Sequence, residues 1–508
     1  MEVIQFLLNG FSIALQWHNI LFVLLGVVIG SGIGALPGLG PMSGVALLMP
    51  FTAALTGGLN PEDAAASAII LLAGIYYGAM YGGSISSILL NTPGDAAAVM
   101  TTLDGYPMAK QGRAGAALTI SAIASFSGGI VSLFGLIFLA KPLSDVALRF
   151  GPADYFSLMI LGLAAVSGLA GKSMTKALIM TVIGLLMATV GIDKVSGVER
   201  FTFGLPEIYN GIEFLTVAVG LFALGEVFKT IFETDITGAA ISKIASFYPT
   251  KQDMKDSAGT MIRGSLIGFF TGVLPGAGAT IASFFSYIVA KKLSKHPEKF
   301  GKGAVEGVAA PESANNGAAG GAMIPMLTLG IPGSGTTAIL MGALIMYNIQ
   351  PGPLLFEEHP RVAWGLIASM FVGNFALVLL NVPIVRVFAK LIVTPAKYLI
   401  PFIIAISVFG VYTVQLSIFD LLLMTGCGVA AYFLAKNDFP LAPLVLAIVL
   451  GPMIENNMRR ALTISNGDFM IFLNKPVSAV FLIGGALWLL VPAILKRCKK
   501  TSAGCESR

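Results

Sequence analysis

Two helix-breaking motifs recur in this chain at a nearly constant separation. Leu36-Pro37-Gly38-Leu39-Gly40 is matched 238 residues later (36 to 274) by Leu274-Pro275-Gly276-Ala277-Gly278. Asn91-Thr92-Pro93-Gly94-Asp95 is matched 239 residues later (91 to 330) by Gly330-Ile331-Pro332-Gly333-Ser334. A helix broken in apolar surroundings exposes N–H groups at one end, which suit a carboxylate, and C=O groups at the other, which suit a cation. Paired breaks in matching halves therefore predict a transport site.

Hydroxyl and amide side chains lie in or near the motifs and would complete such a site. The candidate substrate- and ion-binding residues are Pro37, Gly38, Gly40, Ser84, Asn91, Thr92, Pro93, Gly94, Pro275, Gly276, Gly278, Thr280, Asn315, Asn316, Pro332, Gly333, Ser334 and Thr336. A Na⁺ ion would find oxygen ligands near Asn91, Asn315 and Ser334. A single Pro-Gly pair more often only kinks a packed helix, but four pairs at matched positions favour a site.

The segment 306–317 is unusually polar for its apolar surroundings. Glu312, Asn315 and Asn316 fall at i, i+3 and i+4, which places three oxygen-bearing side chains on one helical face. Ionisable groups within a membrane span are functional candidates, so this face is either a cation site or a proton-linked carboxylate. In the alternative interpretation, 303–316 is the start of a cytoplasmic helix, and Glu306 and Glu312 lie in water beside the cluster of Lys residues. Both interpretations are open at this point.

Two aspartates near the first break have simpler expected roles. Asp95 directly follows the Pro-Gly pair, and we expect it to cap the next helix rather than to bind an ion. Leu103 to Pro107 is expected to form a turn that leads to the Lys110 loop.

The composition identifies the elements that must hold these residues. Of 508 residues, 56% are hydrophobic and only 11% are charged, against about 25% charged in soluble proteins. The chain is therefore predicted to be an all-α polytopic membrane protein with roughly 10–12 spans. It lacks a nucleotide-binding GxxxxGK[ST] loop, metal-ligand spacing and a paired-Asp motif, so we expect no enzyme activity, no metal site and no cofactor beyond a coupling cation.

Loop charges predict that the two repeats run in opposite directions through the membrane. The second LPGxG motif is followed by five Lys between 291 and 302, whereas the segment after the first has Glu62 and Asp63 and no basic residue. Two further pairs of matched loops also exchange character, and basic loops face the cytoplasm. The predicted fold is two inverted repeats, each with a re-entrant hairpin and an unwound helix. The predicted divisions are 1–18 (an apolar helix), 19–200 (first repeat), 201–258 (connecting span and loop), 259–440 (second repeat) and 441–508 (terminal spans and basic tail).

Longer runs of sequence resemble a known family. The LPGLG and LPGAG pair, the run NTPGDAA with its continuation DGYPMAKQGRAG, and the run PESANNGAAGG…GIPGSGTTAIL resemble the large transmembrane subunit of the tripartite tricarboxylate transporter family, over about residues 15–455. The family's signature falls on Gly38, Gly40, Asn91, Pro93, Gly94, Gly276, Gly278, Asn315, Asn316, Pro332, Gly333 and Ser334.

The resemblance implies a function and a set of partners. The chain would be the permease subunit of a binding-protein-dependent secondary transporter in the bacterial inner membrane, with a cytoplasmic C-terminus. A Na⁺ or H⁺ gradient would drive import of a small organic carboxylate, with elevator-like movement inferred by analogy. The partners would be a small membrane subunit and a periplasmic solute-binding protein. The alternative is a passive channel, or an assembly scaffold whose partner carries the activity. The loop of Glu357, Glu358 and His359 is either a solvated outer loop or a docking surface.

Overall fold

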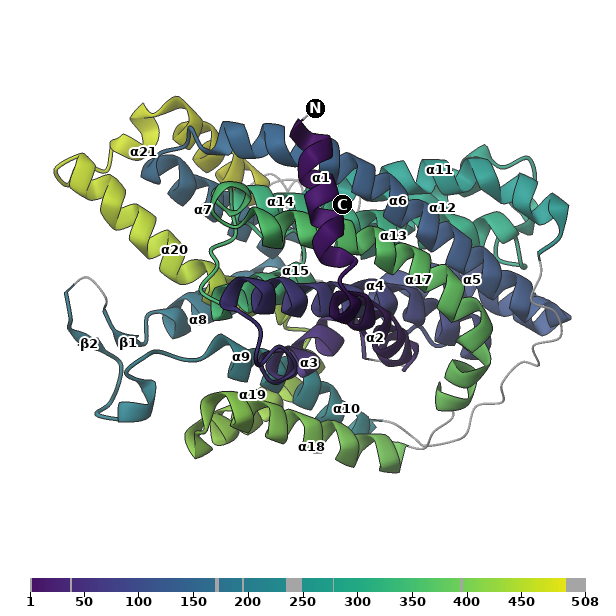
Figure 1. The fold of residues 1–508 in the computed structure, drawn as a ribbon, viewed down its shortest axis with the longest axis horizontal. Helices are drawn as coiled ribbons and strands as arrows, with labels where there is room; N and C mark the ends of the chain where they lie inside the picture. Colours follow the sequence, from purple (N-terminus) through teal and green to yellow (C-terminus); the bar gives the residue numbers. More distant parts are fainter. Residues whose placement is uncertain are drawn as a thin grey trace, which may run out of the picture. The chain divides into compact units, whose positions relative to one another are not determined.

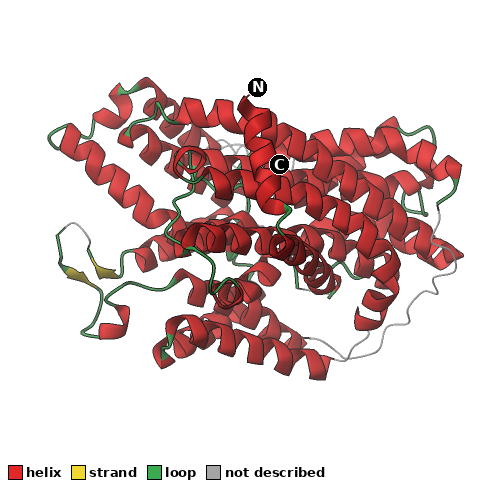
Figure 2. Cartoon of the chain, in the orientation of Figure 1, coloured by secondary structure: helices red, strands yellow, loops and turns green. Residues whose placement is uncertain are grey.

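The computed structural model describes residues 2–36, 39–169, 173–193, 196–233, 249–276, 278–392 and 396–489. Within these ranges the chain is almost entirely helical, and its strands are the two-residue β1 (Gly191–Ile192) and β2 (Glu199–Arg200), which pair antiparallel (Figure 2). The all-α prediction is confirmed. The predictions that involve Pro37, Gly38, Ala277 and the basic tail from 490 onward concern residues outside the described ranges.

Within the described residues, six helical segments are long and apolar enough to cross a membrane. They are Trp17–Ala35, Pro61–Leu90, Ala96–Ala147, Phe214–Phe232, Pro360–Leu380 and Ile418–Lys436. Several shorter apolar helices accompany them, as the predicted half-spans would. The chain is therefore a multi-pass membrane protein, while the predicted total of 10–12 spans stays a prediction.

The chain divides into two compact units, each made of two stretches of sequence. The first comprises residues 1–145 and 213–433, and the second comprises residues 146–212 and 434–508. The two units are defined by the contacts that residues make within each of them and not by the repeated motifs. The boundaries of the repeats predicted above therefore stay predictions.

The first unit contains both motif pairs. Its helices are α1 (Glu2–Ala14), α2 (Trp17–Ala35), α3 (Pro41–Leu55), α4 (Pro61–Leu90), η1 (Ala96–Ala98), α5 (Val99–Met108), η2 (Ala109–Arg113), α6 (Ala114–Ala147), α9 (Phe214–Ala218), η4 (Val219–Leu224), α10 (Gly225–Glu233), α11 (Lys251–Val273), α12 (Gly278–Leu293), η5 (Pro297–Lys299), α13 (Val305–Gly321), α14 (Met323–Leu329), α15 (Gly335–Met346), α16 (Leu355–Glu358), α17 (Pro360–Ile392), α18 (Ala396–Gln415) and α19 (Ile418–Lys436) (Figure 1).

The second unit is smaller and carries none of the predicted site residues. It comprises α7 (Pro152–Leu169), α8 (Met174–Ala188), β1, β2, η3 (Pro206–Ile208), α20 (Ala442–Ile464) and α21 (Ile471–Asn474). α20 packs against α7 and α8. Two ion pairs connect α20 to the segment that contains the strands. Glu455 accepts from Arg200 at 2.6 Å, and Arg459 contacts Asp193 at 3.0 Å.

Each motif pair lies on the same kind of structure: a hairpin of two helices followed by a helix that breaks. In the first copy, α2 and α3 form the hairpin, and α4 ends at the break before η1 and α5. In the second copy, α11 and α12 form the hairpin, and α13 with α14 ends at the break before α15. α11, α12 and α13 pack against one another (Figure 1). The second copy is divided once more, at Ala322 just before Pro325, whereas α4 is continuous.

Small residues let the helices of each copy approach closely, and they do so at matched positions. A methyl group on Gly26, Gly30 or Gly34 of α2 would lie 2.2–2.5 Å from a carbonyl oxygen of α4. The glycines 238 positions later are Gly264, Gly268 and Gly272 of α11. A methyl group on each of them would lie 2.8, 2.1 and 2.3 Å, respectively, from a carbonyl oxygen of α13. Close contact of small residues is the usual way for helices to associate in a membrane. The duplication predicted from the motifs therefore extends to the packing.

The two copies also contact each other reciprocally. α3, the second hairpin arm of the first copy, packs against α15 after the second break, and α12, its counterpart, packs against η1 after the first break. Likewise α4 packs against α15, and α13 packs against α5.

The turn predicted at Leu103 to Pro107 is wrong. These residues lie inside α5, which runs through η2 into α6 with a kink at Gly112, where φ is +79°. The residues that suggested a turn serve tertiary packing instead, since Gly105 packs on Ile88 and Asp104 is hydrogen bonded to a distant segment.

Candidate functional site

The first break separates α4 from the helical run that begins at η1. Asn91 ends α4 in the left-handed conformation, with φ of +57°, which asparagine tolerates better than most residues. Thr92 and Pro93 follow, and Asp95 then caps η1 by accepting from the Ala98 N–H at 3.0 Å. The expected capping role of Asp95 is confirmed. Asn91 and Thr92 are exposed, whereas Gly94 is buried.

The second break has the same construction with different side chains. Gly330 ends α14 with φ of +68°, and Ser334 caps α15 through a reciprocal capping box with Thr337. Pro332, Gly333 and Thr336 are buried, and Ser334 is half-buried. Ser334 occupies the position of Asp95, so the first break carries an acidic cap and the second a neutral one.

Each hairpin tip contacts the break of its own copy. The N–H of Gly276 donates to the carbonyl of Gly333 at 3.1 Å. In the first copy, a methyl group on Gly40 would lie 3.2 Å from Asp95 Cβ. The structure thus brings predicted tip and break residues together, as the motif pairing suggested. Gly278 begins α12 with φ of +64°, and a methyl group on it would meet no atom within 4 Å. Thr280, two residues further on, is half-buried.

The space beside the glycines of the two breaks is filled by the protein's own backbone. A methyl group on Gly94 would lie 2.1 Å from the Gly34 carbonyl oxygen, and one on Gly333 would lie 2.8 Å from Ala322 Cα. Both glycines are candidate site residues, and in this structure they pack closely against neighbouring backbone. Their predicted role in binding stays a prediction.

Side chains connect the two copies at the breaks. The hydroxyl of Tyr76 in α4 interacts with the side chain of Ser334 at the second break. Thr101 of α5 donates to Glu312 Oε1 of α13 at 2.5 Å.

Ser84, another predicted site residue, donates to the Tyr81 carbonyl at 2.8 Å and accepts from Ser121 at 2.7 Å.

The polar face of α13 is buried, which settles the alternative left open by the sequence. Glu312, Asn315 and Asn316 are all 0% exposed, so Glu312 does not lie in water beside the Lys cluster. Asn315 Nδ2 donates to Glu312 Oε2 at 3.5 Å, which confirms that their side chains share one helical face. Asn316 donates to Asn315 Oδ1 and to the Glu312 carbonyl.

Sequence reasoning missed the role of Asp104. Its Oδ1 accepts from the N–H groups of Gly301, Gly303 and Ala304 at 2.8–2.9 Å, and its Oδ2 accepts from the Tyr287 hydroxyl at 2.8 Å. The buried carboxylate ties α5 to the turn that precedes α13. Its position inside an apolar run was the signal that could have marked it, because a buried carboxylate needs several donors.

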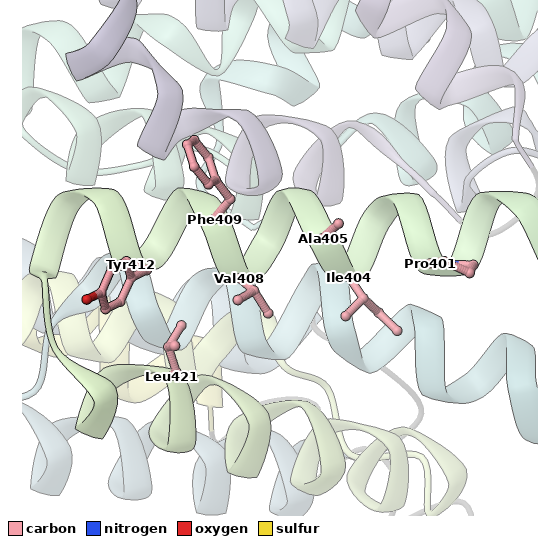
Figure 3. Close-up of a pocket in the computed structure, with 7 residues that line it drawn as sticks. All are labelled: Pro401, Ile404, Ala405, Val408, Phe409, Tyr412 and Leu421. Carbon is pink, nitrogen blue, oxygen red and sulfur yellow. The ribbon is translucent and has the colours of Figure 1, made fainter.

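A groove of about 700 Å³ lies on α18, and none of the predicted site residues lines it. Figure 3 shows its apolar lining, which is Pro401, Ile404, Ala405, Val408, Phe409, Tyr412 and Leu421. The groove offers almost no polar surface to a carboxylate, so the breaks, and not this groove, are the candidate site.

The fold and site define a multi-pass membrane protein built on a duplicated unit of hairpin and broken helix. Residues 20–446 match the tripartite tricarboxylate transporter TctA family, and the chain belongs to that transporter family. The resemblance inferred from the motifs is confirmed.

Two relatives from Agrobacterium vitis are similar to this chain. One, described as an uncharacterized 52.8 kDa protein in the TAR-I ttuC' 3' region, is 42% identical over 491 residues, covering 97% of this chain and 96% of the relative. The other, an uncharacterized protein in the TAR-II ttuC' 3' region, is 44% identical over 228 residues, covering 45% of this chain and 94% of the relative. No solved structure matches the chain.

Proposed function

We propose that this chain is the large permease subunit of a binding-protein-dependent secondary transporter that imports small organic carboxylates, driven by a Na⁺ or H⁺ gradient. One observation carries the proposal: two matched helix breaks lie in one unit, each against the hairpin tip of its own copy. Broken backbone at membrane depth is tolerated only where protein or water covers it, and such breaks form the sites of many transporters. Membership of a tricarboxylate transporter family supports the substrate class.

The two breaks differ in what they would bind. The N-terminus of α15 offers N–H groups beside the neutral cap Ser334 and the hydroxyl of Tyr76, which suits a substrate carboxylate. The first break carries the carboxylate of Asp95, which would repel an anion and attract a cation. We therefore place the substrate carboxylate at the second break and the coupling cation toward Asp95 and Glu312.

The reciprocal contacts between the copies support two repeats related by a two-fold axis. With the opposite loop charges, this favours inverted repeats with re-entrant hairpins. Movement of the hairpins and breaks against the remaining helices would expose the site alternately, in an elevator-like manner. The partners would be a small membrane subunit and a periplasmic solute-binding protein, in a bacterial inner membrane with the C-terminus of this chain in the cytoplasm.

Proteoliposome uptake tests this proposal against a passive channel or an assembly scaffold. The chain is reconstituted with its small subunit, and labelled citrate, succinate and acetate are offered with the solute-binding protein. We expect accumulation above the external concentration that requires both a cation gradient and the binding protein. Uptake that only equilibrates, or that proceeds without the binding protein, would reject the proposal.

Substitution at the second break tests the site itself. Thr336→Val keeps the shape of a buried side chain but removes its hydroxyl, and we expect slower uptake of the carboxylate with unchanged melting temperature. Thr425→Val, on the exposed face of α19 where the hydroxyl donates to the Leu421 carbonyl, is the matched control. Equal uptake by both variants would remove Thr336 from the substrate site.

A further inference from the structure

The carboxyl group of Glu312 is buried in the first unit without a positively charged partner. Its side chain is 0% exposed, and none of the ion pairs among the described residues includes it. An isolated carboxylate in such a place is costly, and the usual remedies are a cation or a proton. The position 239 residues earlier is Ala73, so the first copy carries no carboxyl group at the position that matches Glu312.

The donors around Glu312 are neutral and come from three helices. Thr101 of α5 donates to Oε1 at 2.5 Å, while Ser125 of α6 and Asn315 of α13 approach Oε2 at 3.5 Å. The long contacts leave Oε2 less well satisfied than Oε1. A proton on Oε2 would turn that oxygen into a donor, and the Ser125 hydroxyl can accept it.

Two polar atoms beside the carboxyl group also lack partners. The hydroxyl of Tyr81 and Oδ1 of Asn316 are buried and make no hydrogen bond in the described part of the chain. Tyr81 interacts electrostatically with Glu312, and Asn316 lies one turn along the same helix. Buried polar atoms are normally paired, so these two atoms make the surroundings of the Glu312 carboxyl group polar but incompletely hydrogen bonded.

The helices packed around α13 bring no compensating charge to Glu312. The charged group that interacts with it is Asp95 at the first break, which is itself acidic. α11 contributes Arg263, but that side chain is exposed and donates to Thr260. α12 contributes Tyr287, which donates to Asp104, and the exposed Lys291 and Lys292.

We propose that Glu312 is the coupling-proton site of the transporter, an inference that rests on the function proposed above. The carboxylate takes one proton from water when the site faces outward and becomes a neutral carboxylic acid. In that form it crosses with the loaded unit, and it releases the proton to water on the inner side. Hydroxyl and amide groups can satisfy a neutral acid without a coordination shell. A bound Na⁺ would need several oxygens, and beyond those of Tyr81 and Asn316 it would have to take oxygens that now make hydrogen bonds.

The test compares wild-type protein with Glu312→Gln in the proteoliposome assay, using labelled citrate. A pH difference of about one unit can sustain about tenfold accumulation per proton, and wild-type protein should accumulate citrate with a pH gradient alone. Gln resembles the neutral acid, so the variant should lose accumulation yet keep exchange of internal for external citrate. Glu306→Gln is the matched control, since Glu306 is half-buried on the same helix and bonded to Ser294.

A second measurement does not depend on transport. Infrared spectra of the purified protein should contain the absorption of a neutral carboxyl group that disappears as pH rises and is missing from the Glu312→Gln variant. Accumulation driven by Na⁺ alone and insensitive to pH would overturn the proton assignment while preserving the proposed transporter. Loss of both exchange and accumulation in a folded variant, or an unchanged infrared band, would also overturn it.

Discussion

Asp95 and Ser334 hold equivalent positions but differ in charge, and each begins the helix that follows a break. Both cap that helix through a side-chain oxygen that accepts an N–H of its first turn. The capping function needs only a short side chain with an acceptor, whereas attraction of a cation needs the negative charge of Asp95. Substitution can separate these two contributions.

Asp95→Ala should lower the stability of the protein by about 0.5–2 kcal/mol, because Ala cannot accept the Ala98 N–H. Asp95→Asn should keep nearly all of that stability, because Asn is as good an N-cap as Asp. Thermal unfolding in detergent measures both variants, with Ser334→Ala as the counterpart in the second copy. An Asn variant as unstable as the Ala variant would show that charge, and not capping, stabilises the break.

Single residues also show the limit of prediction from sequence. The i, i+3, i+4 spacing of Glu312, Asn315 and Asn316 was enough to place them on one face. The partners of Glu312 could not be found that way, since Thr101 and Ser125 lie 211 and 187 residues away in sequence. Asp104 was assigned to a turn because Asp and Gly favour turns locally, and only the distant N–H groups of 301–304 show why it is buried.

At the scale of elements, the contact between hairpin and broken helix depends on glycine. The α2 glycines lie one per turn on the face that meets α4, and the α11 glycines repeat that face toward α13. Side chains there would force the helix axes apart and displace the hairpin tips from the breaks. The breaks themselves were predictable from Pro-Gly pairs, whose chemistry is local. The partner helix of each glycine face was not, because helix pairing depends on the whole chain.

Gly30→Ala and Gly268→Ala should each destabilise the protein by about 1–3 kcal/mol, the usual cost of overpacking. The added methyl groups would lie 2.3 Å and 2.1 Å from carbonyl oxygens of the neighbouring helix. Gly426→Ala in α19 is the control, because its methyl group would meet no atom within 4 Å and Ala favours a helix. Melting temperatures of the three variants decide the matter, and a Gly30→Ala variant as stable as the control would contradict it.

At the scale of the molecule, the two copies make reciprocal contacts. The sequence predicted the duplication from motif spacing and the inversion from loop charge. The structure extends the duplication to packing, while the direction of each copy relative to the membrane needs a labelling experiment.

Single cysteines at Gly57→Cys and Lys295→Cys should react with an impermeant maleimide from opposite sides of the membrane. The two exposed positions follow the first and the second hairpin, and only the second is rich in Lys. The background would replace the native Cys427, Cys498 and Cys505 by Ser. Labelling of both positions from the same side of inverted and right-side-out vesicles would rule out the inverted arrangement.

The differences between the copies matter as much as their likeness. If one gene segment was copied to produce both halves, every shared contact descends from one ancestral surface, and every mismatch arose after the fusion. Glu312 in the second half corresponds to Ala73 in the first half, and Asp95 in the first half corresponds to Ser334 in the second. The acidic groups are therefore positions at which the two halves differ in charge, and a protein made of two identical halves would lack that asymmetry.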